Sequence, residues 1–97
     1  MDARKGIQSI EIGGRLLREL ETGSQPMTLT EIARATELSL SSARFYLISL
    51  TRIGLVAQTP SGVRYQLGPA ALRMGLAALA QSDVLELARA ELQSLRD

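Results

Sequence analysis

The sequence contains no cysteine and no histidine. Without them there is no thiol to form a disulfide or to attack a substrate, and the usual sulfur and nitrogen ligands of zinc are missing. The side chain that most often exchanges protons near neutral pH is missing as well. These absences exclude a disulfide framework, a zinc site and a histidine-dependent catalytic triad.

Long apolar runs are also missing. The longest nearly apolar stretch, residues 74–80, is far shorter than the roughly 20 residues that cross a bilayer. The first ten residues, MDARKGIQSI, lack the apolar segment of a signal peptide. We therefore expect a soluble, cytoplasmic protein with no membrane partner.

Aromatic residues make up only 3% of the 97 residues, whereas 45% of the residues are hydrophobic, mostly leucine, isoleucine and alanine. This length fits one domain with a modest core. The composition favours a mainly α-helical fold.

Acidic residues are missing from the middle of the chain. The net charge is only +1, but every aspartate and glutamate lies within residues 2–37 or 83–97. Four arginines fall between these segments, namely Arg44, Arg52, Arg64 and Arg73. This asymmetry indicates that the middle of the chain faces a polyanion. The alternative is an ordinary density of solvated arginines.

The carboxylates give no sign of an enzyme. The closest acidic pairs are Glu19 with Glu21 and Asp83 with Glu86, and both pairs are explained as helix-surface or capping residues. We expect no catalysis, no metal site and no cofactor.

Apolar residues at helical spacing predict a first helix over about residues 9–21, with Ser9 as its N-cap. Gly13 and Gly14 interrupt it, at about 1 kcal/mol each relative to alanine. Either another backbone approaches closely there or the helix is frayed and bent. The first alternative makes Ile10, Gly13 and Gly14 candidates for a dimer interface.

The next segment predicts a helix-turn-helix. Thr28 and Glu31 have the spacing of a capping box and start a second helix that ends by Glu37. Ser39 is the expected N-cap of a third helix over about residues 40–53. Two short helices joined by about three residues form this motif.

The third helix has two unlike sides. At 100° per residue, the apolar side consists of Ala43, Tyr46, Leu47 and Leu50. The other side consists of Ser41, Ser42, Phe45, Ser49 and Arg52, flanked by Arg44 and Ile48. An ordinary solvated face would mix glutamate with lysine, whereas hydroxyls, arginines and an apolar group suit phosphates, base edges and thymine methyls. We predict that this side enters the major groove of DNA; a solvated or partner-binding face is the alternative.

After Gly54 the sequence predicts a hairpin over about residues 56–67, with its turn at residues 60–62. A hairpin directly after a helix-turn-helix is a wing. Arg64, near its tip, is a candidate contact for a backbone phosphate or the minor groove. The alternative is a plain hairpin that closes the core and leaves Arg64 solvated.

Two further helices are expected. Gly68-Pro69 starts a fourth helix, and Ser82-Asp83 caps a last one. Candidate dimerisation residues on the last helix are Leu85, Ala88, Leu92 and Leu95. This helix either folds back on the core or pairs with another chain, and we favour pairing. The expected organisation is a winged helix-turn-helix over residues 1–80 and a linker or dimerisation helix over residues 81–97.

The ordered pieces resemble the DNA-binding domain of the IclR family of bacterial transcription regulators. The residues that carry the resemblance are Gln8-Ser9-Ile10, Leu29-Thr30-Glu31-Ile32-Ala33, Leu38, Ser41-Ser42, Leu47, Leu50, Gly54, Val56, Gly62, Tyr65, Leu67-Gly68-Pro69 and Leu85-Glu86-Leu87-Ala88. The resemblance implies a dimer that reads a pseudo-palindromic operator in double-stranded DNA, as a repressor or an activator. It also implies a small-molecule effector bound by a larger C-terminal domain that this chain does not contain.

Three positions depart from the family pattern. The family usually has arginine at Phe45, a basic residue near Leu40 and glycine at Glu37. These departures affect the expected operator sequence but not the fold. A residue other than glycine in a left-handed turn costs roughly 1–2 kcal/mol, so at Glu37 either the turn is strained or its geometry differs.

The full set of expected DNA-contacting residues is Thr28, Ser39, Leu40, Ser41, Ser42, Arg44, Phe45, Ser49, Arg52 and Arg64. In the family, the recognition helix meets DNA at the positions of Ser41, Ser42 and Arg44. The alternative function is a winged-helix protein-interaction module, in which Phe45, Ile48 and the last helix form an apolar docking patch.

Overall fold

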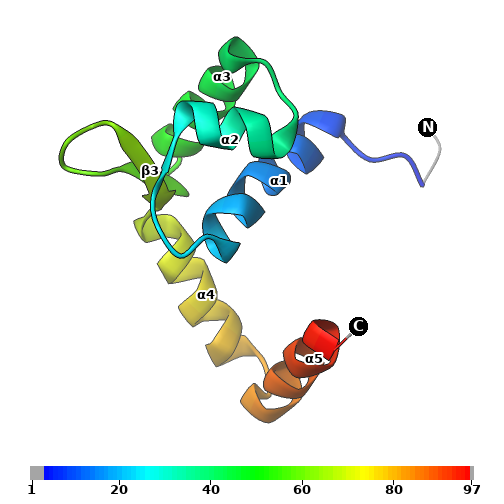
Figure 1. Ribbon diagram of the computed structural model, residues 1–97. Helices are drawn as coiled ribbons and strands as arrows, with labels where there is room; N and C mark the ends of the chain where they lie inside the picture. The colour runs from blue at the N-terminus through cyan, green and yellow to red at the C-terminus, as the bar shows by residue number, and fades with distance from the viewer. Residues whose placement is uncertain (1–3, 97) are drawn as a thin grey trace.

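The computed structural model describes residues 4–96, which form five helices and a small antiparallel sheet (Figure 1). The elements are α1 (Gln8–Thr22), β1 (Met27–Thr28), α2 (Leu29–Thr36), α3 (Leu40–Arg52), β2 (Val56–Gln58), β3 (Arg64–Leu67), α4 (Pro69–Gln81) and α5 (Val84–Arg96). The prediction of a mainly helical winged helix-turn-helix with a C-terminal helix is confirmed.

The core lies where α1, α2 and α3 pack against each other and against the first residue of β2. Its buried members are Leu16, Leu20, Ile32, Leu47, Leu50 and Val56. In α1 and α3 the buried residues are three or four positions apart, and in α2 Ile32, Ala33 and Thr36 are buried, so each helix buries a single face. In α3 the predicted apolar side is confirmed, since Ala43, Leu47 and Leu50 are buried and Tyr46 is half-buried.

Helix α1 runs without interruption through its two glycines, so it is not frayed there. It begins at Gln8, and the prediction that Ser9 caps it is wrong. The carbonyl of Ile7 already accepts hydrogen bonds from Ile10 N and Glu11 N at 3.1 and 3.3 Å, which places Ser9 inside the first turn.

The two glycines of α1 have different surroundings. Gly13 is buried, and a Cβ atom there would lie 3.9 Å from Cδ1 of Tyr46 in α3, an ordinary contact distance. A Cβ atom at Gly14 would have no described atom within 4 Å. The bare backbone at Gly14 therefore faces outward rather than another segment of the same chain.

The first turns of both helices of the predicted helix-turn-helix are held by local hydrogen bonds. The capping box is confirmed: Glu31 N donates to Thr28 Oγ1 at 3.2 Å, and Thr28 N donates to Glu31 Oε1 at 2.8 Å. The Ser39 cap is confirmed as well, since Ser39 Oγ accepts from Ser42 N at 3.1 Å. These caps fix where α2 and α3 begin.

The turn between α2 and α3 is a Schellman motif. Leu38 N donates to Ala33 O at 2.9 Å, and Glu37 N donates to Arg34 O at 3.3 Å. Glu37 takes the left-handed conformation that this motif requires, with φ 59° and ψ 36°. The turn thus keeps the geometry that favours glycine although a side chain occupies it.

The wing belongs to a three-stranded antiparallel sheet of order β1-β3-β2. Strands β2 and β3 form the predicted hairpin, whose turn contains Gly62 at φ +76°. Strand β1 was not predicted. It pairs Met27 with Tyr65 and Thr28 with Arg64, so the segment before α2 is joined to the wing.

The start of α4 is clamped to the short connection between α3 and β2. Gly68 N donates to Leu55 O at 2.8 Å, and Ala70 N donates to Gly54 O at 2.9 Å. A Cβ atom at Gly68 would overlap the carbonyl oxygen of Gly54 and crowd Val56, so only glycine allows this approach. The predicted start of the helix at Gly68-Pro69 is confirmed.

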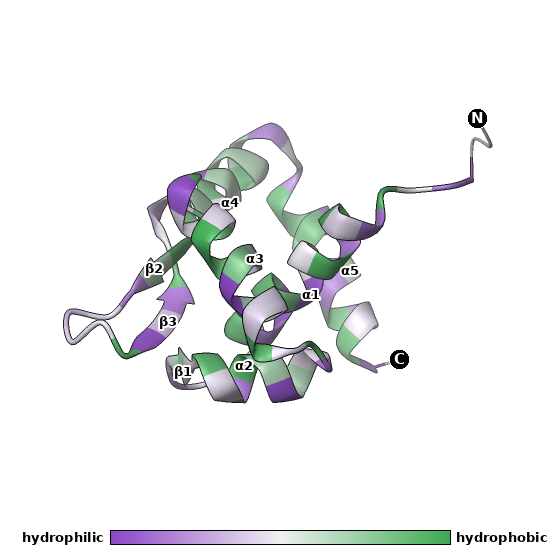
Figure 2. Cartoon of the chain, turned by 90° about the horizontal axis from the view of Figure 1, so that it is seen from above, coloured by the Kyte–Doolittle hydropathy of each residue, from purple (hydrophilic) through white to green (hydrophobic). Residues whose placement is uncertain are grey.

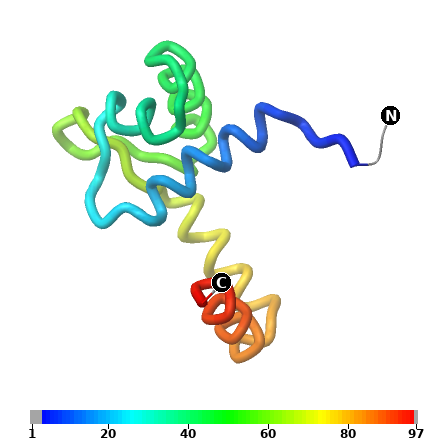
Figure 3. Tube along the Cα trace, turned by 45° about the vertical axis from the view of Figure 1, so that its right-hand side comes forward, coloured from blue at the N-terminus to red at the C-terminus, as the bar shows by residue number. Residues whose placement is uncertain are grey.

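Beyond this clamp the chain leaves the core (Figure 3). Asp83 caps α5, because its Oδ1 accepts from Leu85 N and Glu86 N at 2.9 and 3.2 Å. Figure 2 shows hydrophobic residues along α4. Those of α4 and α5 that stay exposed include Leu72, Leu76, Leu85, Leu92 and Leu95. Within residues 4–96 no helix is both long and apolar enough to span a membrane.

The left-handed turn gives a stability prediction. Replacing Glu37 with glycine should raise the free energy of unfolding by about 0.5–1 kcal/mol, since relief of the steric cost exceeds the added chain entropy. Thermal melting measures the gain as a Tm increase of several degrees. Glu37→Ala is the matched control, because it removes the same charge but keeps Cβ. An equal gain in both variants would assign the effect to the charge.

Candidate nucleic-acid interface

The outer side of α3 is open to solvent. Phe45 is 68% exposed, Leu40 52% and Ile48 39%. Ser41, Arg44, Ser49 and Arg52 are exposed too, and Ser42 is half-buried. The helix therefore presents two guanidinium groups, hydroxyls and large apolar side chains on one surface, with no carboxylate of its own.

Two predicted site residues lie at helix starts and already have capping roles. Thr28 precedes α2 and Ser39 precedes α3, and each side-chain oxygen accepts a backbone N–H of its own helix. Ser39 Oγ also lies 3.4 Å from Ser41 Oγ. The structure thus brings Ser39 and Ser41 together at the amino end of α3.

A cleft of about 330 Å³ separates α3 from the wing. Its lining residues are Arg44, Ile48, Thr51, Arg52, Gln58 and Tyr65. Inside the wing, Gln58 Nε2 donates to Gly62 O at 3.2 Å and to Tyr65 Oη at 3.4 Å. The cleft thus joins two predicted arginines to polar groups of both strands.

Sequence reasoning missed three of these lining residues, namely Thr51, Gln58 and Tyr65. Thr51 follows Arg44 by seven positions, a spacing that keeps both residues on one side of a helix. The polar residues of the wing offered a weaker signal. Their position opposite α3 depends on how the sheet packs, and the sequence pattern does not encode that packing.

Arg64 lies at the first position of β3, directly after the hairpin turn and opposite Thr28. Its Nη1 donates to Pro26 O at 3.1 Å and to Glu31 Oε1 at 3.2 Å. The guanidinium is therefore bound to the start of α2, on the side of the wing that carries β1.

Glu31 is the carboxylate at this junction. Hydrogen bonds from Thr28, first from its backbone N–H, lower the pKa of Glu31 below its ordinary value, and the nearby Arg64 guanidinium lowers it further. The ionised carboxylate is thus favoured by folding.

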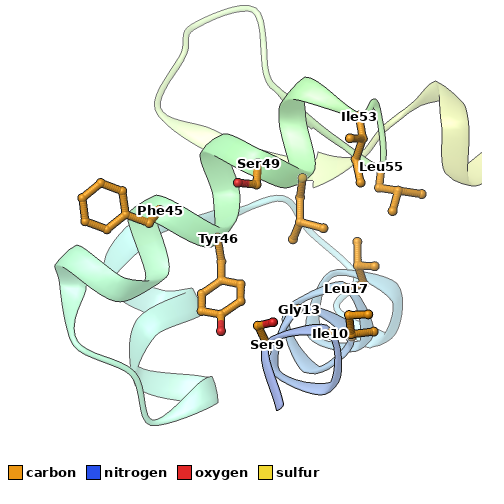
Figure 4. Close-up of a pocket in the computed structure, with 11 residues that line it drawn as sticks. Ser9, Ile10, Gly13, Leu17, Phe45, Tyr46, Ser49, Ile53 and Leu55 are labelled. Atoms are coloured by element: carbon orange, nitrogen blue, oxygen red, sulfur yellow. The ribbon is translucent and has the colours of Figure 1, made fainter. Parts of the chain in front are cut away.

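An apolar groove of about 560 Å³ lies between α1 and α3 (Figure 4). Ile10, Gly13, Gly14 and Leu17 line one wall, and Tyr46, Leu50 and Ile53 line the other. In Figure 4 the Tyr46 ring points towards Ser9 and Gly13, whereas Phe45 projects away from α1. The groove thus contains the three predicted dimerisation residues of α1.

The predicted dimerisation residues of α5 are exposed, with Leu85 at 67%, Leu92 at 59% and Leu95 at 82%. Ala88 is exposed as well. In Figures 1 and 3, α5 lies apart from α3 and the wing, at the far end of α4. Among residues 4–96, no group of three potential metal ligands (histidine, cysteine, aspartate or glutamate) is brought together.

The chain matches the IclR helix-turn-helix domain over residues 9–60. The glycerol operon regulatory protein of Streptomyces griseus is 40% identical over 71 residues, and that of Streptomyces coelicolor is 39% identical over 83 residues. These matches cover 73% and 86% of this chain but 28% and 32% of the relatives. The chain therefore spans about a third of their length.

Solved structures agree with this match. Pseudomonas aeruginosa HmgR has a TM-score of 0.72 and 38% identity, and the similarity covers 94% of this chain and 37% of that one. An IclR transcriptional regulator from Alicyclobacillus acidocaldarius has a TM-score of 0.77 and 31% identity, with 91% and 36% covered.

The lowered pKa of Glu31 gives a pH prediction. Stability from its ionisation is complete above the ordinary value near 4.5 and is lost as the pH falls through the lower folded-state pKa. The Tm difference between wild type and Glu31→Gln should therefore be largest at neutral pH and shrink below pH 4. Glu91→Gln, on the exposed surface of α5, is the control for loss of charge. A difference independent of pH would contradict this interpretation.

Proposed function

This chain belongs to the IclR family and carries its helix-turn-helix, a DNA-binding domain of transcription regulators, and we propose that it binds a specific operator through the outer side of α3. In this proposal α3 enters the major groove and the wing lies over the flanking backbone. The chain binds DNA without catalysing a reaction and acts in the cytoplasm.

The observation that carries the proposal is the exposed, acid-free side of α3. A duplex repels carboxylates, whereas guanidinium and hydroxyl groups bond its phosphates and base edges. Three large apolar side chains are also exposed there, with Phe45 at 68%. Apolar groups on a polar helix face are explained if they meet thymine methyls in the groove.

The proposed contacts divide by chemistry. Arg44 is the main base or phosphate contact, and Arg52 binds a phosphate at the cleft beside the wing. Ser41, Ser42 and Ser49 bond phosphates or base edges. Phe45 and Leu40 make apolar base contacts. Thr28 and Ser39 bring the amino ends of α2 and α3 to flanking phosphates.

We also propose a homodimer on two half-sites about one helical turn apart. The apolar groove at Ile10, Gly13 and Gly14 and the exposed leucines of α5 are the surfaces left for a second copy. The open backbone at Gly14 allows a neighbouring helix to approach closely. The effector of the longer protein would bind a domain beyond this chain.

Arg44 is the side chain expected to contribute most to DNA binding. On a duplex selected from a random pool, Arg44→Ala should weaken binding by about 1–3 kcal/mol, roughly 5- to 150-fold. Its Tm should stay nearly unchanged because the side chain is exposed. Arg89→Ala on α5 is the matched control, with the same charge change far from α3. A Tm loss as large as the binding loss would make Arg44 structural.

Salt dependence separates DNA binding from the protein-interaction alternative. If Arg44 and Arg52 each neutralise one phosphate, the slope of log Kobs against log salt should be about −2 per chain. Fluorescence anisotropy of a labelled duplex from 50 to 300 mM salt measures it. The absence of binding to any duplex, together with salt-insensitive capture of a protein, would favour an apolar docking module.

The dimer proposal is tested with Leu92→Asp. Placing a carboxylate on the α5 apolar face should remove cooperative binding to a two-half-site duplex while the affinity for one half-site persists. Gln93→Asp, one position along the exposed helix, is the control. Sedimentation of the complexes gives the number of chains per duplex. Unchanged cooperativity in Leu92→Asp would remove α5 from the interface.

A further inference from the structure

Arg64 is the basic residue of the wing, yet its guanidinium is turned back onto the chain. Nη1 is bound by Pro26 O at 3.1 Å and Glu31 Oε1 at 3.2 Å. Its side chain is 47% exposed, and that of Glu31 is 53% exposed. Arg64 therefore lies at the surface with hydrogen bonds already made by one end of its guanidinium.

One carboxylate oxygen serves two elements at this junction. Glu31 Oε1 accepts from Thr28 N at 2.8 Å, which closes the capping box of α2, and it also accepts from Arg64 on β3. The backbone ladder between β1 and β3 is only two residues long, with Thr28 opposite Arg64. The side-chain bridge thus reinforces a short ladder at the point where the wing meets the helix-turn-helix.

We propose that Arg64 is a positioning residue rather than a DNA contact: through Pro26 and Glu31 it holds the wing against the start of α2. This inference rests on the proposed function and revises the role first expected for Arg64. By fixing the wing, the bridge sets the opening of the cleft between Arg52 and Gln58 before DNA arrives. A preset cleft avoids the entropy of ordering the wing on binding.

Removing the negative charge of Glu31 distinguishes a positioning role of Arg64 from a direct contact with a DNA phosphate. If Arg64 bound a phosphate, removing the neighbouring carboxylate with Glu31→Gln would strengthen DNA binding, because a repulsive charge is lost. If Arg64 positions the wing, Glu31→Gln loosens the same bridge and weakens binding. Arg64→Met, which keeps an apolar stem but no donor, lowers affinity in both cases. The sign of the Glu31→Gln effect therefore decides between them.

The experiment compares Arg64→Met, Glu31→Gln and the double variant on the selected duplex. We expect each single variant to bind about three- to tenfold more weakly. The double variant should be no weaker than the worse single one, and the salt slope should stay at the wild-type value. Arg73→Met and Glu91→Gln, both exposed and on other helices, control for charge. Tighter binding by Glu31→Gln, or a slope reduced by about one in Arg64→Met, would overturn the proposal.

A second readout needs no DNA, so it stands even if the proposed function fails. Hydrogen exchange of the wing amides, including the one that Thr59 donates to Arg64 O at 2.9 Å, should become faster in both single variants. Exchange in the α1–α3 core should stay at the wild-type rate. Unchanged exchange in the wing would refute the positioning role. If the wild type shows no salt-dependent DNA binding, the proposed function is refuted, whereas the positioning role of Arg64 is not.

Discussion

Burial of one side of α3 is the constraint on which the rest of the molecule depends. Leu47 and Leu50 belong to one buried cluster with Leu16 and Ile32, so the hydrophobic effect fixes the rotation of α3 about its own axis. The side chains half a turn away then face solvent. Core packing and the exposed basic surface are therefore two results of one pattern in thirteen residues.

Hydrogen bonds at the helix ends convert that packing into a defined motif. The Schellman turn ends α2 with Glu37 in the left-handed conformation, and Ser39 caps the start of α3 two residues later. A glutamate there shows that closure of the turn, with Leu38 bonded back to Ala33, outweighs the local steric cost. The turn therefore keeps its geometry although Glu37 stands where the family resemblance implies glycine, and the expected cost is one of stability.

Short-range signals made most of this fold predictable. The capping box at Thr28, the cap at Ser39 and the spacing of Leu47 and Leu50 depend on residues within one or two turns of each other. Strand β1 was missed because a two-residue strand has no periodicity and forms only when β3 lies beside it. The partners of Arg64 were missed for the same reason, since Glu31 is 33 positions away in sequence. The predicted cap at Ser9 failed because the helix begins earlier, with Ile7 at the N-cap position and Ser9 already inside the first turn.

The clamp at Gly68 couples the direction of α4 to the position of α3 and the wing. Its amide and that of Ala70 are tied to Leu55 and Gly54, directly after α3, and the contact leaves no room for even a methyl group. Because α4 is bonded directly to the residues that connect α3 with β2, a change in the direction of α4 would have to be accommodated at the end of α3 and at the start of the wing.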